Sequence, residues 1–335
     1  MENLKSYINE LFLNDLLHNI AIKVGKKDEV LLEYYKSNEM DINENTLFDM
    51  ASVSKMLCTT TLSLIALDKG LISLEDKVTK YFEVPEKGIT IKNLLTHTIG
   101  IGHKSLNLPH ISQQNVAEYI LNLPSDIPIG SDVLYSCPAF IVMGKILEKV
   151  FGDRLDKVFE EYVTKPLGMD KTCYLPLRQS NMVNANVEEK DKGRVNDYNC
   201  QFLGGVAGNA GVFSNITDVT KYIKLLIEGG KPLFSKDVLK IASENHTVKM
   251  QESRGLGFVY SDDKYLRTAD LMPIGSIGHG GWTGQSVFVD LKSGLYVIIL
   301  TDLTVSTQRK FGSPDSDLTK EIIKNIHFKV KQDLF

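Results

Sequence analysis

The sequence predicts an α+β fold, in which an antiparallel sheet is flanked by helices and a mostly helical lobe is inserted. Two short strand patterns lie near the start of the chain, and a strand hairpin lies near its end. Between them the chain carries helical patterns separated by turns. We expect the early and late strands to share one sheet. Residues 1–55 and 203–335 would then form the body of a single unit, 1–335, with 56–202 as the lobe and a ligand cleft between them.

Each expected element follows from a local pattern. The strands alternate apolar and polar residues or are rich in β-branched residues, and the helices repeat apolar residues at a spacing of three to four. A long helix is expected to begin at Ser52 and to end before Gly70. The other elements are strands at 19–24 and 30–35 around the turn 25–28, helices at 91–97, 116–123, 139–150, 155–163 and 217–227, hairpins of 256–260 with 265–268 and of 286–290 with 295–301, and a terminal helix at 318–330.

Composition excludes several classes of function. The 335 residues are 43% hydrophobic and 24% charged, with a net charge of -4, which suits a globular protein with a sizeable core. The sequence has no stripe of basic residues, so we do not expect nucleic acid as a partner. No apolar run is long enough to cross a membrane and no secretory signal is visible, so we expect a cytoplasmic protein. We expect no metal or other cofactor, and four free thiols at Cys58, Cys137, Cys173 and Cys200.

A serine and a lysine at the start of the long helix are candidates for catalysis. Ser52 and Lys55 are three residues apart, which places them on one face of a helix. Lys55 could act as the base that activates the serine if burial and a nearby cation lower its pKa. The helix N-terminus would favour a developing oxyanion. The same spacing recurs at 261–264, which we interpret as a solvated hairpin turn, so spacing alone does not choose between the two serines.

Six segments of the sequence, taken in their order along the chain, distinguish Ser52 from the other serine. They are FDMASVSK at 48–55, which contains Ser52, LLTHTIGI at 94–101, YSC at 135–137, KPLGM at 165–169, FLGGVAGNAGVFS at 202–214 and GHGGWTG at 278–284. This ordered set resembles the β-lactamase and penicillin-binding-protein family of serine hydrolases, the branch nearest class C β-lactamases. The resemblance covers most of the chain and implies a β-lactamase/transpeptidase-like fold and an acyl-enzyme mechanism.

The resemblance also implies a role for each matching residue. Ser52 would be the nucleophile, and Lys55 and Tyr135 would share the work of the general base, with the pKa of Tyr135 lowered by cations. The backbone N–H groups of Ser52 and Trp282 would form the oxyanion hole. The substrate-binding and oxyanion positions would be Cys137, His279, Gly280, Gly281 and Trp282.

The segment at 278–284 falls at the third catalytic motif of the family, which is usually K-T-G or H-x-G. It can be aligned with that motif in two registers. We prefer His279-Gly280-Gly281, because Gly278 precedes it as in the family pattern. The alternative, 282–284, would move the oxyanion donor to Gln285. In the preferred register the sequence departs from the family at three positions. Cys137 replaces an asparagine amide, Gly280 replaces a threonine hydroxyl, and His279 replaces a permanent cation by a group that is mostly neutral at pH 7.

These departures weaken the recognition of penicillins and D-alanyl peptides but leave the nucleophile and base in place. We therefore expect a serine hydrolase that acts on small ester, lactone or β-lactam substrates. Two alternatives stay open: a D-amino-acid peptidase or carboxypeptidase, and a penicillin-binding or inactive module that does not turn over. His97 and His103 are interpreted as structural, and the oligomeric state is not predicted. No G-x-S-x-G, P-loop or dinucleotide motif supports another class.

Overall fold

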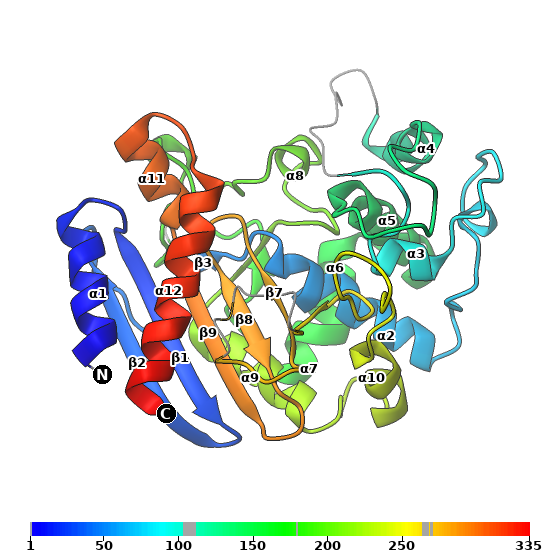
Figure 1. Cartoon of the computed structure of the whole chain (residues 1–335). Helices are drawn as coiled ribbons and strands as arrows, with labels where there is room; N and C mark the ends of the chain where they lie inside the picture. Colours follow the sequence, from blue (N-terminus) through cyan, green and yellow to red (C-terminus); the bar gives the residue numbers. More distant parts are fainter. Residues whose placement is uncertain (1, 103–111, 179, 263–267, 269–270) are drawn as a thin grey trace.

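The computed structural model describes the chain except for residues 1, 103–111, 179, 263–267 and 269–270 (Figure 1). Within the described residues the main sheet has six strands in the order β2-β1-β9-β8-β7-β6. All neighbouring strands are antiparallel, and β1 pairs with β9, so the early and late strands share one sheet as expected. The strands are β1 (Asn19–Lys26), β2 (Glu29–Ser37), β6 (Val259–Tyr260), β7 (Ile277–Gly280), β8 (Ser286–Val289) and β9 (Leu295–Thr301).

The alternation of side chains along the strands builds two apolar layers. On β9, Val297 and Ile299 join the cluster beneath α1 (Glu2–Leu13) and α12 (Ser316–Leu334), while Ile298 and Leu300 join the cluster on the other face. Figure 1 shows α1 and α12 on the same face of the sheet. The opposite face packs against α9 (Ile216–Ile227), whose apolar side chains belong to that second cluster.

The sequence analysis assigned no element to the residues of α1. Leu4, Ile8 and Leu11 recur there at helical spacing and are buried against the sheet. Asp333 near the end of α12 accepts the backbone N–H of Leu4 at 2.9 Å, which ties the first helix to the last. The segment therefore completes the body of the molecule.

Most of the remaining helices lie in 56–202, the segment expected to be helical, and a second, small sheet has the strand order β3-β5-β4. Its strands are β3 (Phe48–Asp49), β4 (Cys173–Tyr174) and β5 (Val212–Ser214), so one of them lies inside the segment expected to be helical. The helices are η1 (Lys55–Thr60), α2 (Thr61–Asp68), η2 (Val78–Lys80), α3 (Ile91–Leu95), η4 (Gln113–Asn115), α4 (Val116–Asn122), α5 (Cys137–Phe151), α6 (Leu155–Phe159), η5 (Glu160–Thr164), α7 (Lys165–Leu167), η6 (Glu189–Asp191), α8 (Tyr198–Phe202), α10 (Lys236–Ser243) and α11 (Leu303–Phe311).

The hairpin of 256–260 with 265–268 is described only in part. Its first arm contains β6, which pairs with β7. Most of the second arm, and Lys264 of the expected turn, lie outside the described residues. Ser261 was expected in a solvated turn but is only 3% exposed, because its backbone bonds to Ser276 and Gly275 fold the segment inward.

Helix α5 illustrates how local sequence fixes an element beside the site. Ser136 caps its first turn by accepting the N–H of Ala139 at 3.1 Å, and Pro138 lies in that turn, where its missing N–H leaves no bond unmade. Gly152 ends the helix with a φ of 80°. Among the helices that the structure describes, none has both the length and the apolar character needed to span a bilayer.

Candidate active site

Ser52 lies between the end of β3 and the start of η1, where the backbone makes a sharp turn. Ala51 has a φ of 45°, in the left-handed region that side chains other than glycine rarely adopt. The buried Asp49 carboxylate accepts the N–H of Ala51 at 2.8 Å and that of Asn196 at 2.7 Å, which holds the turn in place. Burial raises the pKa of Asp49 to about 6. The turn therefore presents Ser52 at a fixed angle.

The Ser52 hydroxyl contacts two potential proton carriers. The Lys55 ammonium donates to Ser52 Oγ at 3.0 Å, and the Tyr135 hydroxyl donates to the same oxygen at 2.8 Å. Lys55 is fully buried and also donates to the Asn209 carbonyl at 2.9 Å and to Cys137 Sγ at 3.3 Å. The structure thus brings together residues 83 positions apart in the sequence.

The protonation of these two groups differs from the expectation. Burial alone would lower the pKa of Lys55, but Cys137 and Tyr135 beside it raise the pKa above its usual value. Burial raises the pKa of Tyr135 and outweighs the lowering effect of the Lys55 charge. The expected lowering of the pKa of Tyr135 is therefore wrong, and the lowered pKa on which the role of Lys55 as a base was conditional is not found. At neutral pH the resting site holds an ammonium group and a neutral phenol.

His97 positions Tyr135 from behind. His97 Nδ1 accepts the backbone N–H of Ser136 at 3.0 Å, and its ring lies 4.7 Å from the ring of Tyr135, between centroids. Burial, together with the positive charges of Arg254 and Lys55, holds the pKa of His97 well below its usual value. The ring is therefore neutral, as an accepting Nδ1 requires. His103, the other histidine interpreted as structural, lies outside the described residues.

A pocket of about 520 Å³ opens in front of Ser52, a size that suits a small-molecule ligand. Every position that the sequence analysis placed in the site lines this pocket, except Lys55, which lies beneath its floor. A larger and more open hollow of about 800 Å³ lies beside α4 and contains none of the predicted site residues. The lining of the Ser52 pocket includes Ser52, Tyr135, Cys137, Asn196, Asp197, Tyr198, Glu252, Arg254, His279, Gly280, Gly281, Trp282 and Lys320.

The two registers of the segment 278–284 differ in the residue whose backbone N–H would be the oxyanion donor. His279 and Gly280 end strand β7, and Gly281 and Trp282 follow them along the pocket wall. Gln285 does not line the pocket: it is 2% exposed, and its side-chain amide donates to the Asp49 carbonyl at 2.7 Å and to the Thr301 carbonyl at 2.9 Å. The register His279-Gly280-Gly281 stays a prediction, and its expected donor, Trp282, borders the pocket.

Arg254 and Glu252 are pocket residues that the sequence analysis missed. They precede β6, and nothing in their spacing relative to Ser52 points to the site. The Asn209 carbonyl that binds Lys55 was also missed as a functional group, although its residue lies in the glycine-rich segment at 202–214. A backbone acceptor leaves no mark in residue type, so no sequence signal could have identified it.

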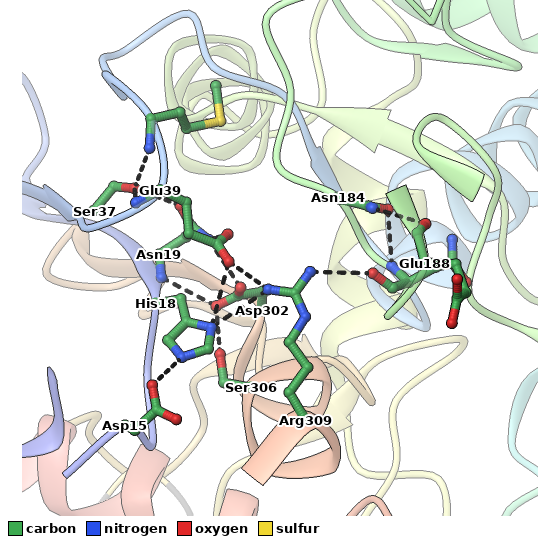
Figure 2. Close-up of polar contacts among 12 residues, drawn as sticks. Asp15, His18, Asn19, Ser37, Glu39, Asn184, Glu188, Asp302, Ser306 and Arg309 are labelled. Atoms are coloured by element: carbon green, nitrogen blue, oxygen red, sulfur yellow. Dashed lines mark hydrogen bonds and ion pairs between the residues drawn. The ribbon is translucent and has the colours of Figure 1, made fainter. Parts of the chain in front are cut away.

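A second polar cluster lies where α11 meets the start of β1 (Figure 2). Asp302 accepts the backbone N–H of Asn19 at 3.1 Å, its side-chain amide at 2.8 Å and the Ser306 hydroxyl at 3.1 Å. Arg309 forms an ion pair with Glu39. We call these residues, with His18, the α11 clamp.

The α11 clamp is also the one group in the described residues with metal-ligand spacing. Ligand atoms of His18, Glu39 and Asp302 lie within 4.8 Å of one another. The Arg309 guanidinium already supplies the positive charge there, since it pairs with Glu39 and lies 3.4 Å from His18 Nδ1. The donors present fit an ion-pair network better than a metal site. Through Thr304, whose hydroxyl donates to the Trp282 carbonyl, α11 also supports the pocket wall.

Known proteins are similar to this chain in sequence. The family model described as "Beta-lactamase" matches residues 17–317. A putative D-alanyl-D-alanine carboxypeptidase of Escherichia coli (strain K12) is 26% identical over 335 residues, which cover 86% of this chain and 76% of that protein.

Two solved structures have a similar fold. The hydrolase EstCE1, described as having promiscuous acyltransferase activity, superposes with a TM-score of 0.78 at 18% identity, over 98% of each chain. A β-lactamase/D-alanine carboxypeptidase from Pseudomonas syringae gives 0.76 at 16% identity, over 97% of each chain. At these identities the likeness shows the fold alone.

Proposed function

Because the chain belongs to the β-lactamase family of serine hydrolases, we propose that Ser52 is its nucleophile and forms an acyl-enzyme with small ester, lactone or β-lactam substrates. The observation that carries the proposal is the pair of hydrogen bonds at Ser52 Oγ, one from Lys55 and one from Tyr135. A hydroxyl held between two such groups can lose its proton as it attacks a carbonyl carbon.

Proton transfer in this scheme uses Lys55 and Tyr135 as one unit. The reactive form has lost one proton from the pair, so that a neutral amine or a phenolate faces Ser52 Oγ. The pair takes the serine proton as the bond from Oγ to the carbonyl carbon forms. It passes that proton to the leaving atom, oxygen in an ester or lactone and nitrogen in a β-lactam, as the bond between the carbonyl carbon and this atom breaks. Water, deprotonated by the same pair, then releases the acid and restores Ser52. The N–H groups of Ser52 and Trp282 would bind the oxyanion.

Two features of the pocket support an ester over an amide substrate. Cys137 Sγ lies against the Lys55 ammonium at 3.3 Å, and a thiol offers no paired donor and acceptor to a substrate amide. Gly280 offers no hydroxyl to a substrate carboxylate. Esters have better leaving groups than amides and depend less on such contacts.

A carboxypeptidase acting on D-amino-acid peptides is the second candidate, and the names of the curated relatives favour it. The third candidate is a penicillin-binding module that is acylated without turnover. We also propose that the protein is cytoplasmic. We propose further that its only partner is a small acyl compound, and that it binds neither nucleic acid nor membrane. Cell fractionation tests the first of these, and binding assays with nucleic acid and lipid vesicles test the second.

One set of incubations separates the candidates. The protein is treated in turn with a fluorophosphonate, a penicillin, a short 4-nitrophenyl ester and a D-alanyl-D-alanine peptide, and intact mass and product release are followed. We expect the label on Ser52 and turnover of the ester. A stable penicilloyl adduct without turnover would favour the binding module, and faster release of D-alanine than of nitrophenol would favour the peptidase.

The matched control uses the other serine with the same spacing. Ser52→Ala should lose the label and at least about 10³-fold in kcat/KM, in the range seen when a nucleophile is removed. Ser261→Ala should keep both, because Ser261 does not line the pocket. A label that survives in Ser52→Ala would contradict the proposal.

A further inference from the structure

A buried carboxylate lies directly behind the turn that carries the nucleophile. Asp49 ends strand β3, is 2% exposed and does not line the Ser52 pocket. One of its oxygens accepts the backbone N–H of Ala51 at 2.8 Å, and the other accepts that of Asn196 at 2.7 Å. The carboxylate therefore joins the turn before Ser52 to a segment of the pocket wall that is distant in the sequence.

The same wall segment also holds the group that binds Lys55. The Asp197 carboxylate accepts the side-chain amide of Asn209 at 3.0 Å. The backbone carbonyl of Asn209 in turn accepts the Lys55 ammonium at 2.9 Å. A chain of contacts thus runs from Asp49 through 196–197 and Asn209 to Lys55, which itself donates to the hydroxyl of the nucleophile.

The negative charge of Asp49 is not balanced by a cation. No basic side chain forms an ion pair with it among the residues that the structure describes, and the nearby Asp197 carboxylate repels it. The Cys200 thiol, on α8, stays neutral because burial raises its pKa well above its usual value. The Lys55 ammonium, on η1, donates to other groups. An uncompensated buried charge weakens a fold, so a gain in stability does not account for this carboxylate.

From this geometry we infer that ionised Asp49 is a positioning residue for the acylation of Ser52, because it fixes the nucleophile turn relative to the acceptor that holds Lys55. The inference rests on the proposed function and adds to it a residue that touches neither the substrate nor the reacting atoms. Protonation turns one carboxyl oxygen into a donor, so one of the two backbone N–H groups loses its acceptor. The pKa of Asp49 is raised to about 6, so this loss occurs in mildly acidic solution.

The rate at which a fluorophosphonate labels Ser52 tests the inference, since it reports on the nucleophile without a deacylation step. In Asp49→Asn an amide nitrogen replaces one of the two accepting oxygens. We expect the maximal rate constant of labelling, kinact, to fall by roughly 10- to 100-fold, as for the loss of a hydrogen bond to a charged group. The reagent concentration that gives half of the maximal rate, KI, should not change, because Asp49 does not line the pocket.

The pH dependence of labelling separates a positioning role from a purely structural one. Above neutrality, kinact of the parent protein should rise by about tenfold per pH unit, as the pair of Lys55 and Tyr135 loses a proton. Below a pH of about 6 the dependence should approach a hundredfold per unit, because Asp49 titrates as well. Asp49→Asn should lack this steeper limb, since an amide does not titrate. Circular dichroism at each pH verifies that the proteins are folded.

Two further variants make the test specific. Asp218→Asn is the matched control: Asp218 is also 2% exposed and accepts two backbone N–H groups, at 2.9 and 3.0 Å, but they belong to residues 171 and 172, away from the nucleophile turn. Its kinact should equal that of the parent. In Asp49→Ser the hydroxyl can still accept the N–H of Ala51, two residues on, but the tie to Asn196 is lost. This variant should also lose rate and the steeper limb, and it keeps the test decisive if Asp49→Asn does not fold.

The outcomes separate this inference from the proposed function. If Ser52 of the parent protein is not labelled, the proposed function fails. If Ser52 is labelled as fast in Asp49→Asn as in the parent, only the inference on Asp49 is overturned. The same holds if Asp218→Asn slows labelling as much, or if the steeper limb below pH 6 persists in the Asp49 variants.

Discussion

Lys55 and Tyr135 are both protonated in the resting site, and this sets how the activity should vary with pH. The pKa of each is raised, so the form of the pair that lacks one proton is a minor species at neutral pH. It becomes the major species only as the pH rises. We therefore predict that kcat/KM for a 4-nitrophenyl ester rises by close to tenfold per pH unit above neutrality, until the pair has titrated. A rate profile that is flat from pH 6 to 9 would contradict this assignment.

Cys137 is the first of the groups that raise the pKa of Lys55. We predict that Cys137→Ala shifts the acidic limb of the rate profile to lower pH, because the ammonium loses its contact with the sulfur at 3.3 Å. Cys58→Ala is the matched control, since Cys58 is equally buried but makes no bond to Lys55. The profiles are measured with one ester for all three proteins. An equal shift of the acidic limb in Cys137→Ala and Cys58→Ala would contradict the prediction.

The sequence predicted which residues would lie together in the site, but it did not predict their protonation. Ser52, Lys55 and Tyr135 stand in ordered motifs, and the structure brings them within hydrogen-bond distance. Their pKa values depend on burial and on partners distant in the chain, which no motif encodes. Arg254 stands in no motif and emerges only when the fold closes the pocket.

Among the elements, the long helix behind Ser52 shows what periodicity can and cannot predict. Its apolar residues predicted a helix, but Lys55–Thr60 is a π-helical turn followed by the α-helical segment Thr61–Asp68. A wider turn shifts every later side chain around the axis, and apolar spacing over six residues is too short to reveal it. Strand β4 was missed for a similar reason, because two residues carry no period.

Helix α11 is held by the α11 clamp, and its loss should weaken the fold. Arg309 is about one quarter exposed and pairs with Glu39, beside the buried Asp302. We predict that Arg309→Met lowers the free energy of unfolding by about 1–2 kcal/mol, as expected for a partly buried hydrogen bond between charged groups. The change is measured by urea unfolding.

The control for α11 is an ion pair of the same kind on the open surface. Lys224 pairs with Asp28, which is 90% exposed, so Lys224→Met should change the free energy of unfolding much less than Arg309→Met does. If Arg309→Met and Lys224→Met lower the free energy of unfolding equally, the α11 clamp has no special role in stability. Because Thr304 of α11 donates to the Trp282 carbonyl, Arg309→Met is also expected to lower kcat/KM for the ester.

Over the full chain, the sequence predicted that the early and late strands share one sheet, but it did not predict the strand order or assign the first helix. Strand patterns at both ends of the chain with helices between them leave few ways to build one sheet, and β1 beside β9 is one of them. The apolar side chains on one face of β1 and β9 must then be buried by other elements. Helix α12 supplies part of it, and α1, which the sequence analysis left without an element, supplies the rest.

His327 joins that cover to the sheet and should make the whole fold sensitive to acid. It is fully buried on α12, and its Nε2 lies 2.9 Å from the Ser286 hydroxyl on β8. Burial lowers its pKa to about 3, from 6.5 when unfolded. Below pH 6.5 the histidine therefore binds a proton in the unfolded chain but not in the folded chain. The free energy of unfolding falls as the pH drops towards 3. At pH 5 the loss is about 2 kcal/mol.

His327→Gln removes this titration and keeps a side chain that can bond to Ser286. We predict that the free energy of unfolding of the variant falls less steeply between pH 6.5 and 4 than that of the parent protein. A slope remains, because the pKa of His97 is lowered in the same direction. His246→Gln is the control, since His246 is partly exposed and its ring Nε2 bonds to the Ile241 carbonyl at 2.8 Å. Urea unfolding across this pH range gives the slopes, and equal slopes for His327→Gln and the parent would contradict the prediction.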